Sequence, residues 1–179
     1  MKRTRVFMIT LAAVFAALTA VLSQISIPIG PVPINLALLS VFTAGGLLGA
    51  KYGAASQIGY VILGAIGLPV FAGFTAGPGI IFGPTGGFIW GYVLAALLIG
   101  LAVDLFGTTI PTLSLSMIVA LIVVYLLGCT WFVFGHQYTM QQALSYCVIP
   151  FMLPDMIKIA GACALVNRLY PELKKIHPR

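Results

Sequence analysis

Long apolar runs, separated by short stretches rich in glycine, proline or polar residues, make up most of this chain. An apolar run of roughly 17 to 25 residues is long enough to cross a bilayer as one helix. The segment at 54–66 is short for a span, so we expect its neighbours to supply part of the membrane depth. The segment at 112–134 is strongly apolar and typical of a lipid-facing or scaffold helix. The pattern predicts six membrane segments, at about residues 6–24, 35–50, 54–66, 86–105, 112–134 and 154–170.

Composition supports a membrane location for the whole chain. Of 179 residues, 61% are hydrophobic and 7% are charged, whereas about a quarter of the residues in a soluble domain are charged. The 20 glycines and 11 prolines fit a membrane protein in which irregular segments line a cavity. We therefore expect an all-α integral membrane protein with six transmembrane helices in the lipid bilayer, forming a single membrane domain over residues 1–179.

Basic residues lie almost entirely at segment ends. Of nine Lys and Arg, three lie at the start of the chain, four lie at its end, and Lys51 lies in an expected tight turn at 51–53. This distribution follows the positive-inside rule, which places both termini and the turn on the cytoplasmic side of the cell membrane. It differs from a basic surface that binds nucleic acid, so we expect no nucleic-acid partner. Asp104, at the inner end of its segment, is expected to be solvated.

Two irregular stretches fall on the outer side in this topology. Residues 25–34 contain three prolines, which exclude a regular helix and predict an ordered apolar loop, long enough to be a lid. Residues 67–88 interleave glycines with phenylalanines, which suits an apolar pocket wall with backbone N–H groups available to a ligand. A cluster of surface turns is the alternative. The stretch 140–149 is too short to span, and we expect it to lie along the outer surface, after a solvated His136.

An acid and a base stand inside the last apolar segment, at Asp155 and Lys158. Residues three apart share one face of a helix. Ionisable side chains are expensive in hydrocarbon, so such residues indicate a functional site. Pro154 fits the first turn of a helix, which places Asp155 near the positive helix end. Either the two charges simply neutralise each other, or they hold the unlike ends of one ligand.

Other functional classes are disfavoured by what the sequence lacks. No GxxxxGK[ST] motif is present, so the chain cannot hydrolyse ATP by that route. The membrane segments carry neither a catalytic set of ionisable residues nor the recurring polar residues of a channel, so we expect a binding protein, not an enzyme, with no cofactor of its own. The cysteines have no metal-ligand spacing and are expected to be small apolar residues without a metal; they are Cys129, Cys147 and Cys163.

The first segment carries alanines at a four-residue spacing, namely Ala12, Ala16 and Ala20. Small residues at this spacing form a smooth helix face over which another helix can approach closely. Spacing alone favours ordinary packing within the chain over contact with a partner protein.

Several motifs in order resemble the BioY family, the biotin-binding membrane components of energy-coupling factor (ECF) transporters. The resemblance covers nearly the whole chain, and the GLPVFAG and GPTGG motifs in this order are quite specific. At positions 35 and 37 the family often has Thr and Gln, whereas this chain has Asn35 and Ala37; Pro154 replaces a usual Gly. The matching motifs are PIGPVPI (28–34), GLPVFAG (67–73), GPTGGF (83–88) with Gly91 and Tyr92, and Leu153-Pro154-Asp155 with Lys158.

The resemblance implies six membrane helices and biotin bound near the outer face, under the first and third loops. It also implies a separate module of a coupling membrane protein and two ABC-type ATPases, which use ATP, and a contact between Ala12, Ala16 and Ala20 and the coupling protein. Whether the module is dedicated or shared, or the chain works alone as a homo-oligomer, is left open. The expected substrate-binding residues are Asp155 and Lys158, which the resemblance carries over, with Asn35, Phe71, Phe74, Gly86, Gly87, Phe88 and Tyr92. The alternatives are a binder of another vitamin, such as thiamine or riboflavin, and a membrane scaffold with a structural Asp/Lys pair.

Overall fold

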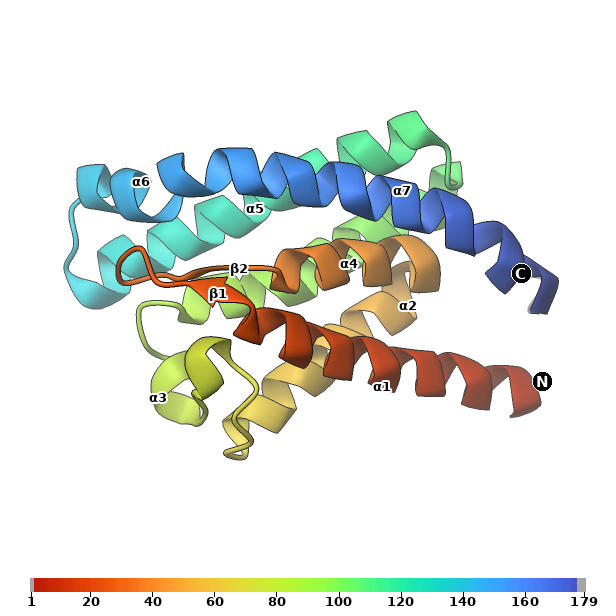
Figure 1. Cartoon of the computed structure of the whole chain (residues 1–179), viewed down its shortest axis with the longest axis horizontal. Helices are drawn as coiled ribbons and strands as arrows, with labels where there is room; N and C mark the ends of the chain where they lie inside the picture. Colours follow the sequence, from red (N-terminus) through yellow and green to blue (C-terminus); the bar gives the residue numbers. More distant parts are fainter. Residues whose placement is uncertain (1, 177–179) are drawn as a thin grey trace.

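The computed structural model describes residues 2–176, and five long helices account for most of them (Figure 1). These are α1 (Lys2–Gln24), α2 (Ala37–Ala65), α4 (Gly86–Phe106), α5 (Ile110–His136) and α7 (Met152–Ile176). Short elements connect them, namely β1 (Ser26–Ile27), β2 (Ile34–Asn35), the 3-10 helices η1 (Ala72–Phe74) and η2 (Ile149–Phe151), α3 (Pro78–Ile81) and α6 (Met140–Cys147). β1 and β2 pair antiparallel, so the proline-rich stretch is a small hairpin.

Helix α2 reverses direction in the middle, and so provides two membrane segments (Figure 1). The break is at Gly49, whose φ of 74° and ψ of −177° are not helical. The predicted turn at 51–53 is therefore wrong in position: the glycine that tolerates a positive φ marks the reversal, and Lys51 already lies in the second half. Asp104 accepts a hydrogen bond from the N–H of Ala50 (2.9 Å) and so caps this second half, a structural role that the expected solvation did not include.

The predicted six-segment membrane architecture is confirmed for the described residues. Four stretches, 5–24, 86–106, 110–135 and 140–175, are long and apolar enough to cross a membrane, and the two halves of α2 add two shorter segments. Successive segments run antiparallel, so both termini lie at one end of the bundle, here called the termini end (Figure 1). The hairpin, α3 and α6 lie at the opposite end, here called the loop end. The last helix extends beyond its predicted end, through Pro171 to Ile176.

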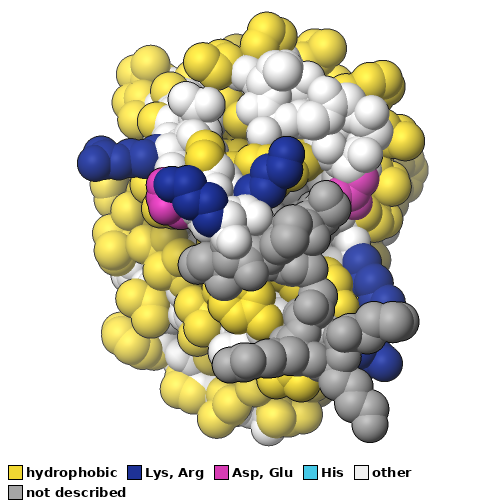
Figure 2. All heavy atoms as spheres, turned by 90° about the vertical axis from the view of Figure 1, so that its right-hand side faces the viewer, with side chains coloured by type: hydrophobic (Ala, Val, Ile, Leu, Met, Phe, Trp, Pro, Cys, Tyr) yellow, Lys and Arg dark blue, Asp and Glu magenta, His cyan; other side chains and the backbone are white. Residues whose placement is uncertain are grey.

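Charged side chains gather at the termini end, and the surface around them is largely apolar (Figure 2). This distribution is expected for a bundle whose sides face lipid. Arg179, which we also expect on the cytoplasmic side, lies outside the described residues. The exposed basic side chains of the described part are Arg5, Lys51, Arg168, Lys174 and Lys175.

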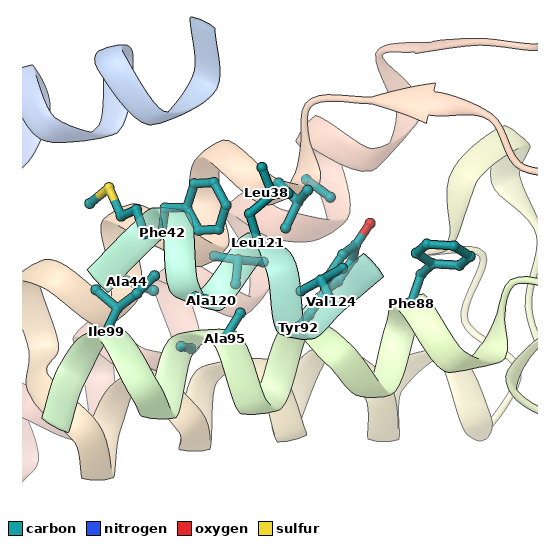
Figure 3. Packing of buried hydrophobic residues seen from close by; sticks show 14 of the residues in the cluster. Leu38, Phe42, Ala44, Phe88, Tyr92, Ala95, Ile99, Ala120, Leu121 and Val124 are labelled. Atoms are coloured by element: carbon teal, nitrogen blue, oxygen red, sulfur yellow. The ribbon is translucent and has the colours of Figure 1, made fainter. Parts of the chain in front are cut away.

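The core is built mainly by α2, α4 and α5 and contains many small residues. Because lipid removes much of the hydrophobic drive between helices, close van der Waals packing over small residues holds such bundles together. At Gly45 of α2, an added Cβ would lie 2.8 Å from the carbonyl oxygen of Ala96 in α4. Four of the buried residues of α4 lie along one face at a helical spacing (Figure 3), namely Phe88, Tyr92, Ala95 and Ile99.

Candidate functional site

A cavity of about 220 Å³ lies at the loop end of the bundle. The hairpin, both halves of α2, the segment 71–75, and α3, α4, α5 and α7 all contribute to its lining. Most of these side chains are apolar or aromatic, and a few polar groups converge among them, which is the usual composition of a small-molecule site. The predicted residues that line it are Asn35, Phe71, Phe88, Tyr92, Asp155 and Lys158.

The Asp155–Lys158 pair is buried in the cavity wall. Asp155 is fully buried and Lys158 is 5% exposed, and Lys158 Nζ lies 2.6 Å from Asp155 Oδ1. α7 begins at Met152, so Pro154 stands in the first turn, where its missing N–H has no helical partner to lose. Asp155 in the same turn is favoured by the positive end of the helix dipole. The two charges are therefore paired with each other, and both line the cavity.

Tyr125 of α5 is a polar neighbour of this pair that the sequence pattern does not predict. Its hydroxyl donates a hydrogen bond to Asp155 Oδ2 at 2.6 Å. Each carboxylate oxygen of Asp155 thus has one donor, Lys158 on one and Tyr125 on the other. The apolar sequence of α5 indicates a lipid-facing or scaffold helix, but α5 also forms a wall of the cavity. The available signal was the single tyrosine of an otherwise apolar run.

Two further tyrosines line the cavity, Tyr92 as predicted and Tyr60 in addition. The Tyr92 side chain lies beside Asn35, and Asn35 Oδ1 also accepts a hydrogen bond from the N–H of Ala37 (3.0 Å) at the start of α2. Tyr60 meets the ring of Phe71 edge-on, with ring centres 5.4 Å apart. Asn35 therefore has a structural role in the start of α2, whatever it contributes to a ligand.

The structure does not bring Gly86 and Gly87 into the cavity lining. A Cβ on Gly86 would overlap the carbonyl oxygen of Ile81, and one on Gly87 would overlap the side chain of Trp131. Trp131 in turn donates its indole N–H to the carbonyl oxygen of Gly83 (3.1 Å). Gly86 is thus needed for close approach to the backbone of α3 and Gly87 for close approach to α5, and not, as predicted, as backbone donors facing a ligand.

Phe74 also lies outside the cavity lining. Its side chain is 72% exposed, and its φ of 57° is unusual for an aromatic residue. That backbone conformation directs its N–H to Gln24 Oε1 at 2.8 Å. The prediction that Phe74 forms a pocket wall is therefore corrected, whereas Phe71 in the same motif does line the cavity.

The alanine stripe of α1 faces the second half of α2. Ala12 and Ala16 are 7% and 4% exposed, and a Cβ added at Gly59 would lie 3.7 Å from that of Ala16. Both alanines line a shallow groove between these helices, whereas Ala20, which is half-buried, does not. Packing within the chain accounts for their burial, and contact with a partner stays a prediction.

No metal centre is found within residues 2–176, where no three His, Cys, Asp or Glu side chains lie close enough to share an ion. The three cysteines are buried and unpaired by disulfide bonds.

A helical membrane protein with a cavity at one end of its bundle, aromatic walls and one buried ion pair belongs to the class that binds small molecules within the membrane. Comparison with known proteins specifies the family. The model of the BioY family matches residues 1–175, and the chain belongs to this family. The resemblance indicated by the sequence motifs is thus confirmed.

Relatives and a solved structure agree with this assignment. The "Probable biotin transporter BioY" of Pyrococcus horikoshii is 40% identical over 90% of this chain and 94% of its own length. The "Biotin transporter BioY" of Thermotoga maritima is 39% identical over 88% and 92%. The crystal structure of an S-component for biotin from an ECF-type ABC transporter superposes with a TM-score of 0.87 at 30% identity, covering 94% of this chain and 93% of that one.

Proposed function

We propose that this protein captures biotin from the outer side of the cytoplasmic membrane, as the substrate-binding component of an ECF-type transporter. The observation that carries the proposal is the buried Asp155–Lys158 pair, with the hydroxyl of Tyr125 bonded to it, in the wall of the cavity. It occurs in a chain that is related, over nearly its whole length, to proteins named biotin transporters.

The cavity suits the chemistry of biotin, which has a ureido ring, an apolar thiophane ring and a carboxylate tail. The Asp155 carboxylate accepts hydrogen bonds from ureido N–H groups, whereas the Lys158 ammonium donates to a carbonyl or carboxylate oxygen. The rings of Phe71, Phe88 and Tyr92 cover the apolar part. Because Lys158 and Tyr125 already neutralise and solvate the carboxylate, the ligand exchanges partners at Asp155 without having to compensate a bare charge.

The orientation of the protein in the membrane follows from the distribution of its basic side chains. Basic side chains at the termini end favour the cytoplasmic side there, with N- and C-termini inside. The loop end, with the cavity, then faces the outside, where a scarce vitamin would be captured.

Transport would need partners at the opposite end. The described chain has no nucleotide-binding motif, so we infer that ATP is used by separate ABC-type ATPases, through a coupling membrane protein. The groove between α1 and α2, with Ala12 and Ala16 in its lining and Arg5 and Lys51 beside it, is the surface we propose for that coupling protein.

Labelled biotin binding to the purified protein tests the site. Asp155→Asn keeps the shape of the side chain but removes its charge, and Lys158→Ala leaves a buried carboxylate with one donor fewer. Truncating one partner of a buried, hydrogen-bonded charge pair at a binding surface costs about 2–5 kcal/mol of binding free energy, so we expect affinity to fall by about thirtyfold or more in both variants. Gln141→Ala, exposed on α6, is the control.

Unchanged affinity in both variants, measured on folded protein, would reject the pocket assignment. Competition by thiamine or riboflavin but not by biotin would reassign the vitamin. The ion pair between Asp155 and Lys158 is also what a structural role requires. Loss of folding in both variants, together with no binding of any of the three vitamins to wild type, would favour a scaffold.

A further inference from the structure

The last turn of α1 holds the segment that follows α2 through two side chains, Ser23 and Gln24. Ser23 Oγ donates to the carbonyl oxygen of Val70 at 2.6 Å. Gln24 Nε2 lies 3.1 Å from the carbonyl oxygens of both Val70 and Phe71, and its two hydrogens are shared with the carbonyl oxygen of Ala20 (3.0 Å) and Ser23 Oγ (2.9 Å) in its own helix turn. Gln24 Oε1 accepts the N–H of Phe74 at 2.8 Å. The side-chain amide of Gln24 therefore bonds carbonyl oxygens and an N–H group of a backbone segment about fifty residues away, as the backbone of a neighbouring β-strand would.

That backbone needs holding, because its conformation is unfavourable. Residues 71–75 form a tight loop closed by the bond from Phe71 N–H to the carbonyl oxygen of Thr75 (3.0 Å). Within it, Gly73 and Phe74 both have positive φ, 71° and 57°. Glycine tolerates this region, but for a bulky residue it persists only where surrounding contacts enforce it. The bond from Phe74 N–H to Gln24 is such a contact.

The loop held in this way forms part of the cavity wall. Phe71, Ala72 and Thr75 line the cavity. Phe71 is 1% exposed, and its ring lies against Gly64, where any Cβ would overlap it. A displacement of the 70–74 backbone therefore moves the Phe71 ring, which has little other space than the cavity itself.

We propose that Gln24 is a positioning residue of the binding site: it does not line the cavity, but its amide holds the wall formed by residues 71–75 at the distance that the ligand requires. This inference rests on the proposed biotin-binding function. Gln24 is also the last residue of α1, just before the hairpin that begins at Ser26. The end of α1 therefore contacts residues 70–74 and leads directly into the hairpin, and both of these segments line the cavity.

Two measurements on the purified full-length protein test the proposal. Gln24→Met keeps the length of the side chain and removes every hydrogen bond of the amide; Gln141→Met, at an exposed glutamine of α6, is the matched control. In ligand-free Gln24→Met we expect hydrogen exchange of the amides at 70–75 to rise about tenfold or more, while the amides of α5 and α7 keep wild-type rates. We expect the Kd for biotin to rise about tenfold, and the control to change neither.

Gln24→Glu keeps the size of the side chain and changes only its hydrogen bonding, so it separates positioning of the loop from side-chain packing. It also provides a second test if the Met variant does not fold. An ionised Glu accepts from Phe74 but cannot donate to Val70 and Phe71, whereas a protonated Glu can do both. We therefore expect a weak-binding Gln24→Glu protein whose affinity, relative to wild type at the same pH, recovers as pH falls through the titration of the new carboxyl group.

The outcomes are distinguishable. Faster exchange at 70–75 with unchanged biotin affinity would show that the amide fastens the loop without serving the site, and so would overturn the proposal. Wild-type affinity of Gln24→Glu at every pH would overturn it as well. If wild type itself binds no biotin, the proposed function fails, and this inference fails with it.

Discussion

The cavity has two coverings, and they are held very differently. The glycine-rich segment 67–86 is fastened along its length: Gly77 N–H bonds the carbonyl oxygen of Gly64 (2.8 Å), Gln24 holds residues 70–74, and Trp131 holds Gly83. The proline-rich hairpin is tied by a two-residue strand pair, by one bond from Leu36 N–H to the carbonyl oxygen of Leu22 (3.2 Å), and by the contact of Asn35 with Tyr92. Its tip, residues 28–31, is exposed.

The difference follows from what the two residue types offer. Glycine allows close approach and keeps its N–H, so a glycine-rich segment can be bonded tightly to its neighbours. Proline restricts the backbone but supplies no N–H, so a proline-rich segment is stiff and yet weakly attached. The first suits a fixed wall and the second suits a lid that moves as a unit. We expect ligand affinity to depend on the wall and ligand exchange rates to depend on the hairpin.

The largest loss of biotin affinity is expected from a substitution that pushes the glycine-rich wall, residues 67–86, into the cavity. Gly64→Ala places a methyl group where the Phe71 ring lies, so the ring must move. Overpacking costs about 1–3 kcal/mol, and we expect biotin affinity to fall by about ten- to a hundredfold in a binding titration. Gly79→Ala is the matched control, since a Cβ there meets nothing within 4 Å. Equal affinities for the two variants would refute the fixed wall.

A smaller loss of affinity is expected when the hydrogen bond that holds the wall at Gly83 is removed. Trp131→Phe keeps an aromatic ring against Gly87 but removes the donor to the carbonyl oxygen of Gly83. A hydrogen bond contributes about 1 kcal/mol net, so we expect a loss of affinity of about fivefold with faster amide exchange at 83–88. Trp90→Phe, at a half-exposed tryptophan of α4, controls for loss of an indole. If both substitutions act alike, the bond to Gly83 does not hold the wall.

The smallest effect on affinity is expected in the hairpin. Pro31, the last residue of the exposed tip, lines the cavity. Pro31→Gly raises the conformational entropy of the flexible chain, an effect of about 0.4–1 kcal/mol in free energy. We expect stopped-flow binding to give faster association and faster dissociation, with Kd changed by no more than about twofold. A large change in Kd with unaltered rates of ligand exchange would make the hairpin a wall as well, and the contrast between the two coverings would disappear.

The site was only partly predictable from the sequence. Asp155 and Lys158 could be identified because their charge is anomalous in their own apolar segment, and that anomaly is local. Tyr60 and Tyr125 could not be identified as cavity residues from the sequence. Each contributes a single hydroxyl group, and the direction in which it points depends on how its helix is rotated against its neighbours. Gly86 and Gly87 share a motif with a cavity residue, Phe88, but Gly86 packs against the end of α3 and Gly87 packs against α5.

What the sequence alone determined is the set of membrane segments, their antiparallel order and the buried pair, since each follows from the length of an apolar run or the cost of a charge in it. Only the tertiary structure decided where α2 reverses, which polar groups meet Asp155, and how Gln24 holds a loop about fifty residues away. The physical reason is that such contacts depend on which helix faces meet, and that choice is made by packing between segments distant in the chain.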